Sequence, residues 1–369
     1  MTRTPRGAAQ APHADHLSRP AAFGVLFLAA LGACSGAQRP PEPHANRDAA
    51  ADGFIDDAGA QTTAPGLKVA FLGDQGVNAN ARGVLQLVVA ERADALIHLG
   101  DLSYGDASPE TWEAQLDDEL GADFPVVAVI GNHDVTDWYG DSGFEARLRK
   151  RLTRTPELHC DGEYGVDATC TFRGLSAVLL GVGSHGDGHE PYLESALTES
   201  QAAFRLCIWH KNQHDMQVGA KADEIGWAPY QLCASHGAPI LTGHEHSYSR
   251  TLTLTAVGDR AREHGAIGHP TDVELAPGST FVVVSGLGGQ SRRAETRDHE
   301  SDSWWAAIYA QGKQLRDGVT VGTEADIQDG ALFIDFHVDG DPYKAHAYFK
   351  TVNGELQDEF TWRTQKPRK

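Results

Sequence analysis

Short apolar runs recur along this chain and alternate with segments in which apolar residues have helical spacing. Val84, Leu87 and Val88 lie on one helical face, which predicts a helix over 79–93, and a second helix is predicted over 109–120. Runs without polar alternation are typical of strands buried on both faces, so the pattern indicates an α/β fold with layered helices and sheets. The predicted strands are residues 69–72, 95–99, 125–130, 206–209 and 239–242.

After residue 275 the pattern changes to one of paired strands. Residues 281–285 form a further apolar run, and the runs 331–336 and 343–349 flank the turn-forming sequence Asp339-Gly340-Asp341-Pro342. Two strand-like runs around such a turn predict a late antiparallel hairpin.

The first 34 residues have the pattern of an export signal. Arginines precede an apolar run at 21–31 that is too short to span a bilayer and suits the core of a signal peptide. The run ends in Leu31-Gly32-Ala33-Cys34, which resembles a bacterial lipobox. We therefore expect a signal peptide over 1–33 and an exported cell-envelope lipoprotein. A lipid on Cys34 would be its only membrane attachment, and plain secretion is the alternative.

Residues 34–66 are rich in Pro, Ala, Asp and Gly and show no hydrophobic period. This composition predicts a disordered tether, with a catalytic domain over 67–369.

Charge and cysteine content narrow the class of protein further. The formal net charge of −20 argues against non-specific nucleic-acid binding, although bound metals can still attract an anionic substrate. Export permits disulfides. Cys160 and Cys170 flank a hairpin-like loop and are expected to pair, whereas Cys207 and Cys233 either pair or remain buried thiols.

Five of the predicted strands end in side chains that can bind metal. The carboxyl ends of strands in an open α/β sheet share one edge, so residues far apart in sequence can converge there. The set mixes carboxylate, phenol, amide and imidazole groups, which suits iron, zinc or manganese, and it contains no cysteine, which argues against a structural zinc site. The candidate ligands are Asp74, Asp101, Tyr104, Asn132, His210, His244 and His246.

These blocks resemble those of the calcineurin-like metallophosphoesterases: an Asp after the first strand, then Gly-Asp, Gly-Asn-His, a lone His and Gly-His-x-His. Within that group the chain is most similar to the purple acid phosphatases. Asp74-Gln75-Gly76 lacks the His of the usual Asp-x-His block, and Gly100-Asp101-Leu102-Ser103-Tyr104 supplies a tyrosine in its place. The resemblance covers roughly residues 67–350.

The resemblance implies a four-layer αββα sandwich of two mixed β-sheets flanked by helices. It also implies two metal ions bridged by Asp101. Ferric iron would be bound by Asp74, Tyr104 and His246, and a divalent ion (Zn²⁺, Fe²⁺ or Mn²⁺) by Asn132, His210 and His244.

The implied activity is hydrolysis of phosphate monoesters, with a metal-bound hydroxide as nucleophile. Two cations would clamp the phosphate of a small substrate. His133 would stabilise the transition state or protonate the leaving group, which makes His133 and Asp101 the expected catalytic residues. The alternatives are a phosphodiesterase or nucleotide hydrolase with the same site, and a surface lipoprotein that binds metal without turnover.

Several residues near these blocks remain open. His214 is a rival to His210 as a ligand, or a substrate-binding group, because the sequence after His210 departs from the family's His-Pro. Arg250 either contacts phosphate or pairs with an acid. We expect His98 to be a hydrogen-bonded core residue, and His185 and His189 to lie in a surface loop.

Overall fold

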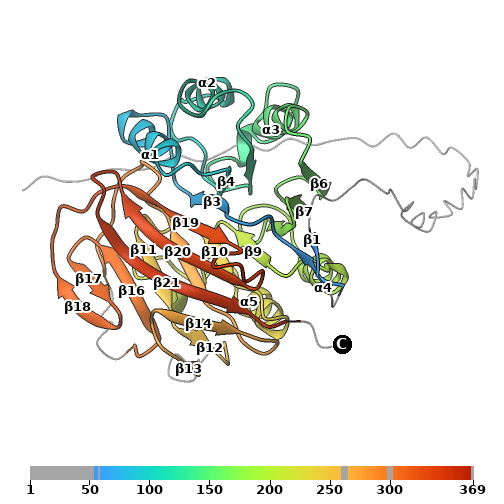
Figure 1. Ribbon diagram of the computed structural model, residues 1–369. Coiled ribbons are helices and arrows are strands. Elements are labelled where there is room, and N and C mark those ends of the chain that lie inside the picture. Colours follow the sequence, from blue (N-terminus) through green and yellow to red (C-terminus); the bar gives the residue numbers. More distant parts are fainter. Residues whose placement is uncertain (1–53, 57–58, 259–264, 297–301, 367–369) are drawn as a thin grey trace, which may run out of the picture. The chain divides into compact units, whose positions relative to one another are not determined.

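A computed structural model describes residues 54–56, 59–258, 265–296 and 302–366 (Figure 1). These residues belong to one compact unit, Ala49–Lys369. The predicted signal peptide, Cys34 and the first part of the predicted tether lie outside the described residues.

One of the two main sheets contains the first three predicted strands. Within it β3 pairs in parallel with β4, and β4 with β5, while β3 pairs antiparallel with β19. The predicted late hairpin is formed by β19 and β20. In spatial order the seven strands are β14 (Asp272–Leu275), β21 (Leu356–Thr364), β20 (Lys344–Thr351), β19 (Gly330–Phe336), β3 (Leu67–Leu72), β4 (Ala95–His98) and β5 (Val126–Ala128).

The second main sheet contains the other two strands that were expected to carry ligands. Strands β8, β9, β10 and β15 are parallel neighbours, and antiparallel pairs flank them on both sides. In spatial order the ten strands are β18 (Val319–Gly322), β17 (Lys313–Arg316), β16 (Trp305–Ala310), β11 (Tyr248–Thr251), β15 (Val282–Ser285), β10 (Ile240–Thr242), β9 (Arg205–Trp209), β8 (Leu175–Leu180), β7 (Asp167–Phe172) and β6 (Leu158–Glu163).

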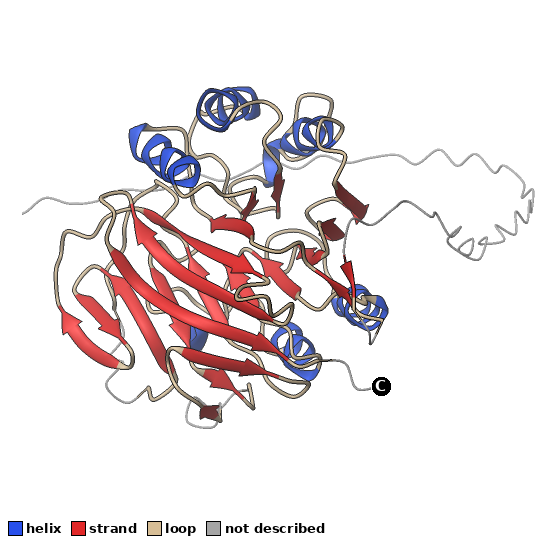
Figure 2. Cartoon of the chain, in the orientation of Figure 1, coloured by secondary structure: helices blue, strands red, loops and turns tan. Residues whose placement is uncertain are grey.

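Helices lie on part of the outer face of each sheet, and the ribbons leave β20 and β21 without a helix over them (Figures 1 and 2). Helices α1 (Ala79–Ala90), α2 (Pro109–Leu120) and α3 (Phe144–Leu152) pack on the seven-stranded sheet, through contacts of α1 with β19 and of α3 with β5. Helices α4 (Glu190–Glu199) and α5 (Ala228–Ser235) pack on the ten-stranded sheet. The expected four-layer αββα sandwich is therefore confirmed.

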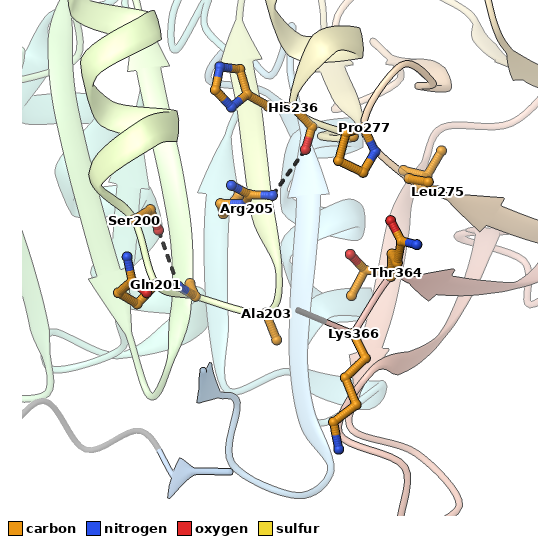
Figure 3. A pocket seen from close by; sticks show the side chains of 13 residues that line it. Ser200, Gln201, Ala203, Arg205, His236, Leu275, Pro277, Thr364 and Lys366 are labelled. Carbon is orange, nitrogen blue, oxygen red and sulfur yellow. Dashed lines mark hydrogen bonds between the residues drawn. The ribbon is translucent and has the colours of Figure 1, made fainter. Parts of the chain in front are cut away.

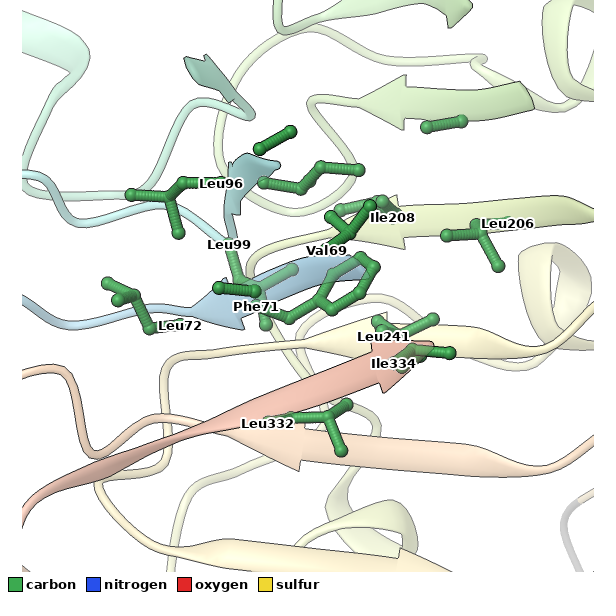
Figure 4. Packing of buried hydrophobic residues seen from close by; sticks show 14 of the residues in the cluster. Val69, Phe71, Leu72, Leu96, Leu99, Leu206, Ile208, Leu241, Leu332 and Ile334 are labelled. Atoms are coloured by element: carbon green, nitrogen blue, oxygen red, sulfur yellow. The ribbon is translucent and has the colours of Figure 1, made fainter. Parts of the chain in front are cut away.

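Each face of β9 is buried against a different layer. Leu206 and Ile208 belong to the cluster between the sheets, whereas Cys207 and Trp209 belong to a second cluster with α4 and α5. Burial on both faces explains why this strand has a continuous apolar sequence. Figure 4 shows the packing between the sheets for Val69, Phe71, Leu206, Ile208, Leu241, Leu332 and Ile334.

Both candidate disulfides are present. Cys160–Cys170 joins the paired strands β6 and β7, and Cys207–Cys233 joins β9 to α5. The second bridge ties the strand that precedes His210 to the helix packed over it, which resolves the alternative that the sequence left open.

The predicted start of the ordered domain at Leu67 was wrong. Two short paired strands, β1 (Phe54–Ile55) and β2 (Gln61–Thr62), lie within the expected tether. The amide of Gln61 donates to the carbonyl of Gln201, and that of Ala203 donates to the carbonyl of Gln61. Hydrogen bonding to a distant loop orders this segment, and a hydrophobic period does not report such pairing.

The remaining short elements are a two-stranded pair and two single-turn helices: β12 (Thr253–Leu254), β13 (Ala266–Ile267), η1 (Val135–Asp137) and η2 (His214–Met216). Across the described ranges, no helix combines the length and apolar character needed to cross a membrane.

Candidate metal centre

The loops that follow the five predicted strands meet at one edge of the sandwich. The amide of Asp74 donates to the carbonyl of Gly100, and the amide of Gly243 donates to the carbonyl of His210. Asp74, Asp101 and His244 have φ angles of 59°, 55° and 70°, in the left-handed backbone region that residues other than glycine rarely adopt. Strained backbone at three candidate ligands is typical of a functional site.

Gly131 allows two of these loops to approach closely. A Cβ atom at this position would lie 2.1 Å from the amide nitrogen of Asp101 and 2.2 Å from its Oδ1. The Gly-Asn-His block therefore needs glycine next to Asn132 so that the loops after β4 and β5 can touch.

The first group of ligands surrounds the hydroxyl of Tyr104. The hydroxyl lies 3.0 Å from Asp74 Oδ1, 2.9 Å from Asp101 Oδ2 and 3.3 Å from His246 Nε2. His246 Nε2 is also 3.2 Å from Asp74 Oδ1. Residues from the ends of β3, β4 and β10 thus place their donor atoms around one point.

The second group consists of Asp101, His210 and His244, whose donor atoms all lie within 4.8 Å of one another. His210 Nε2 is 3.2 Å from Asp101 Oδ2 and 3.2 Å from His244 Nδ1. Asn132 Oδ1 is buried and has no hydrogen-bond partner among the described residues. A buried amide oxygen without a partner, in the residue after the Gly131 that touches Asp101, fits a metal ligand.

Asp101 belongs to both groups. Its Oδ2 contacts Tyr104 in the first group and His210 in the second, while its Oδ1 accepts from the amide of His133 at 2.9 Å. This is the position that a bridging carboxylate requires.

The three histidines all direct one ring nitrogen inward and hydrogen-bond through the other. Nδ1 of His210 donates to the carbonyl of Leu99 at 2.8 Å, and Nδ1 of His246 donates to the carbonyl of Ser291 at 2.7 Å. Nε2 of His244 is 2.8 Å from Glu224 Oε2. Outer partners of this kind fix the ring orientation and leave the inner lone pair available to a metal.

Burial and charge set the protonation of the ligands without metal. Burial alone would lower the pKa of His210, but Asp101 and Asp74 raise it to about 9. Burial, and then Asp74 and Asp101, raise the pKa of the Tyr104 hydroxyl well above its ordinary value. A cation bound at the same point would act in the opposite direction and favour the phenolate.

His133 lies at the mouth of the site. Its side chain is 50% exposed, and its Nε2 is 4.0 Å from Asp101 Oδ2. Its ring centroid is 4.5 Å from that of Tyr104. A histidine that is open to solvent and close to the bridging carboxylate can exchange protons with a bound substrate.

The structure separates His210 from its rival. His210 is fully buried between Asp101 and His244, whereas His214 lies on η2 and its Nδ1 donates to the carbonyl of Lys221 at 2.5 Å. His214 therefore orients a loop and does not join the ligand group.

Of the two alternatives left open for Arg250, the structure shows the pairing with an acid and not a position in the site. Its guanidinium donates to both oxygens of Asp358, at 2.6 and 2.9 Å, and lies 3.8 Å from the ring centroid of Phe360. Its side chain is fully buried in strand β11, between the sheets. Asp358, the acid that pairs with Arg250, is 108 residues away in sequence, so sequence reasoning could not identify it.

Two other histidines also differ from expectation. His98 is a core residue, but neither of its ring nitrogens has a hydrogen-bond partner among the described residues, and burial lowers its pKa to about 3. His189 is 5% exposed, with Nδ1 2.7 Å from Asp167 Oδ1, so it is not a surface residue. His185 and His189 line a cavity of about 620 Å³ that Glu224 also borders.

Sequence reasoning missed the residues that support the ligands. The buried carboxylate of Asp134 accepts from the amides of Asp101, Leu102 and Gly131 at 2.7–2.9 Å. Burial, and then Asp101, raise its pKa to about 7. Asp134 directly follows His133, so its position in the block was a usable signal, whereas Glu224 and Ser291 lie in loops without a pattern.

A second large cavity, of about 570 Å³, lies at the opposite ends of the strands (Figure 3). Arg205, the first residue of β9, lines it and donates to the carbonyls of Leu197 and His236 at 3.0 Å. The guanidinium of Arg205 is therefore already hydrogen-bonded to backbone carbonyls. None of the candidate metal ligands lines this cavity.

Comparison with known proteins agrees with this geometry. A family model described as calcineurin-like phosphoesterase matches residues 67–248, which include β3 and all seven candidate ligands. This chain belongs to the metallophosphoesterase superfamily. A comparison with curated protein sequences found no match.

Three solved structures illustrate what this metallophosphoesterase is similar to. A purple acid phosphatase from yellow lupin (Lupinus luteus) seeds superposes with a TM-score of 0.53 at 15% identity, over 83% of this chain and 56% of the lupin protein. The chain thus spans little more than half of that relative. GAP50, the anchor in the inner membrane complex of Plasmodium, has a TM-score of 0.46 at 12% identity, over 83% and 90% of the two chains. A dimetal phosphatase from Danio rerio has a TM-score of 0.41 at 12% identity, over 81% and 99%.

The buried ion pair leads to a prediction that separates structure from catalysis. Asp358→Asn leaves Arg250 buried without its counter-charge, and we expect a loss of about 3–5 kcal/mol in the free energy of unfolding, measured with urea. Asp272→Asn breaks an exposed pair with Arg363 and should cost at most about 1 kcal/mol. The KM of folded Asp358→Asn for an aryl phosphate should equal that of wild type, because Arg250 does not touch the substrate. A raised KM with an unchanged free energy of unfolding would show instead that Arg250 acts in the site.

The raised pKa of His210 predicts the pH dependence of metal-free protein. A folded-state pKa of about 9 against 6.5 in the unfolded chain gives stability that is complete below pH 6.5 and lost as pH rises through 9. The loss, about 3 kcal/mol, should appear in urea titrations of chelator-treated protein between pH 6 and 10. His210→Gln should lack it, whereas the control His159→Gln, on the surface of β6, should keep it. An equal loss in all three proteins would contradict the assignment.

Proposed function

We propose that this protein hydrolyses phosphate monoesters with a dinuclear metal centre of the purple acid phosphatase type. The observation that carries the proposal is the Tyr104 hydroxyl within 3.3 Å of Asp74, Asp101 and His246. A phenol between two buried carboxylates is unfavourable as an anion unless a highly charged cation is bound there. Three anionic ligands suit ferric iron better than a divalent ion.

The donor set fits the second metal as well. Asn132 offers an orphaned oxygen, and His210 and His244 offer inward ring nitrogens. Imidazole and amide ligands suit zinc, ferrous iron or manganese. When bound, two such ions would neutralise the charge of a phosphate and lower the pKa of water.

The chain's own residues complete the chemistry. Asp101 holds the two halves of the site in register, since it contacts Tyr104 and His210 with one oxygen. His133 is the half-exposed residue next to it and would donate a proton to the departing alkoxide, which then leaves as the alcohol. The backbone amide of His133 donates a hydrogen bond to Asp101, and this contact holds the proposed proton donor close to the bridging carboxylate.

Replacement of Tyr104 tests the ferric assignment. Protein loaded with ferric iron should show a visible absorption band from charge transfer between phenolate and iron. Tyr104→Phe should lose the band, because no other tyrosine contacts the ligand groups in the described structure. The control Tyr139→Phe, whose hydroxyl donates to Glu163, should keep it. A colourless protein that is fully active with zinc or manganese alone would refute ferric iron.

Replacement of Asp101 tests the site itself. Asp101→Asn removes the bridging charge, and we expect the kcat for an aryl phosphate monoester to fall by at least about 10³-fold. Asp106→Asn, an exposed change five residues further on, should behave as wild type. The substrate panel should include monoesters and diesters, together with metal analysis. Wild-type protein with two metals that cleaves only diesters would contradict the monoester assignment.

A further inference from the structure

Lys221 is carried to the site by a loop without a sequence motif. Two side chains hold its backbone carbonyl, since His214 Nδ1 donates to it at 2.5 Å and Gln217 Nε2 at 2.9 Å. Gln217 Oε1 also accepts from the amide of Gly219 at 2.6 Å. A side chain at Gly219 would collide with the carboxylate of Glu245, so the loop lies directly against the Gly-His-x-His block.

The ammonium of Lys221 ends beside a metal ligand. Nζ is 3.0 Å from Nδ1 and 3.0 Å from Nε2 of His244. Because Nε2 is hydrogen-bonded to Glu224, Nδ1 is the nitrogen with a free lone pair, and Nζ, which is equally far from both nitrogens, is not aligned with that lone pair. Nδ1 is also the nitrogen that faces His210 in the second ligand group.

The other charges in this corner already have partners. Glu224 is paired with Lys211 and His244, and Arg293 Nη1 lies 3.6 Å from Glu245 Oε2. Among the described residues, no carboxylate oxygen forms an ion pair with Lys221. Its charge is therefore available to an anion that enters the site.

A metal bound at Nδ1 would place a second cation next to this ammonium. The repulsion is relieved when an anion lies between the two, and a doubly charged phosphoryl group relieves it more than a singly charged one. We propose that Lys221 binds the phosphoryl oxygens of the substrate and selects dianionic monoesters over monoanionic diesters. This inference rests on the proposed function and assigns a specificity residue to it.

The test compares wild type, Lys221→Met, Lys221→Arg and the control Lys150→Met, an exposed position on α3, all loaded with metal. Lys221→Met should lower kcat/KM for an aryl monoester and raise the Ki of inorganic phosphate by roughly 10- to 100-fold, as expected for one charge-assisted hydrogen bond. The diester kcat/KM should fall by only about 3- to 10-fold, because a singly charged phosphoryl group has about half the Coulomb interaction with the ammonium. Lys221→Arg should recover part of the phosphate affinity.

Each contrary result has a distinct meaning. Equal losses on monoester and diester, or an unchanged Ki for phosphate, would overturn the role of Lys221 while leaving the enzyme a phosphatase. Loss of metal from Lys221→Met would assign the lysine to the ligand shell and also overturn the proposal. A wild-type protein that cleaves only diesters would refute the proposed function. In that case the role of Lys221 would still be tested by calorimetry, which compares phosphate binding to wild type and to Lys221→Met.

Discussion

The constraint that organises this molecule is a pair of buried carboxylates that contact the same phenol hydroxyl. Asp74 and Asp101 are 0% and 1% exposed, and both contact the hydroxyl of Tyr104. Two such charges in a poorly polarisable interior are unfavourable unless they are neutralised. In metal-free protein His210 and His246 lie against them, and His210 is held protonated as a result. Metal ions relieve the same electrostatic problem more completely, and the ligand set of the superfamily follows from it.

The arrangement is possible because parallel strands bring loop after loop to one edge. Strands β3, β4 and β5 belong to one sheet and β9 and β10 to the other, so the site forms where the two sheets meet. The loops approach so closely that Gly131 has no room for a side chain, and three ligands adopt left-handed backbone. The large buried core between the sheets and the second disulfide supply the rigidity that maintains this strain.

The support around the ligands is as specific as the ligands themselves. A carbonyl or carboxylate outside the site orients each of the three histidines, and Asp134 holds the loops after β4 and β5 through three backbone amides. The loop that carries Lys221 adds a cation on the substrate side. A metal centre thus extends well beyond the atoms that touch metal, and the outer contacts decide which nitrogen of each ring is available.

The sequence alone determined the five strands that precede the ligands, the first two helices, the late hairpin and the order of the ligand blocks, because burial on both faces and strand-end positions leave a local pattern. It also determined the compensating pair Gly76 and Tyr104. Only the tertiary structure decided between His210 and His214, identified Asp358 as the acid that pairs with Arg250, and ordered residues before Leu67. It alone revealed Glu224, Ser291 and Lys221. These outcomes depend on contacts between segments remote in sequence, and hydrophobic periodicity and motif spacing carry no information about such contacts.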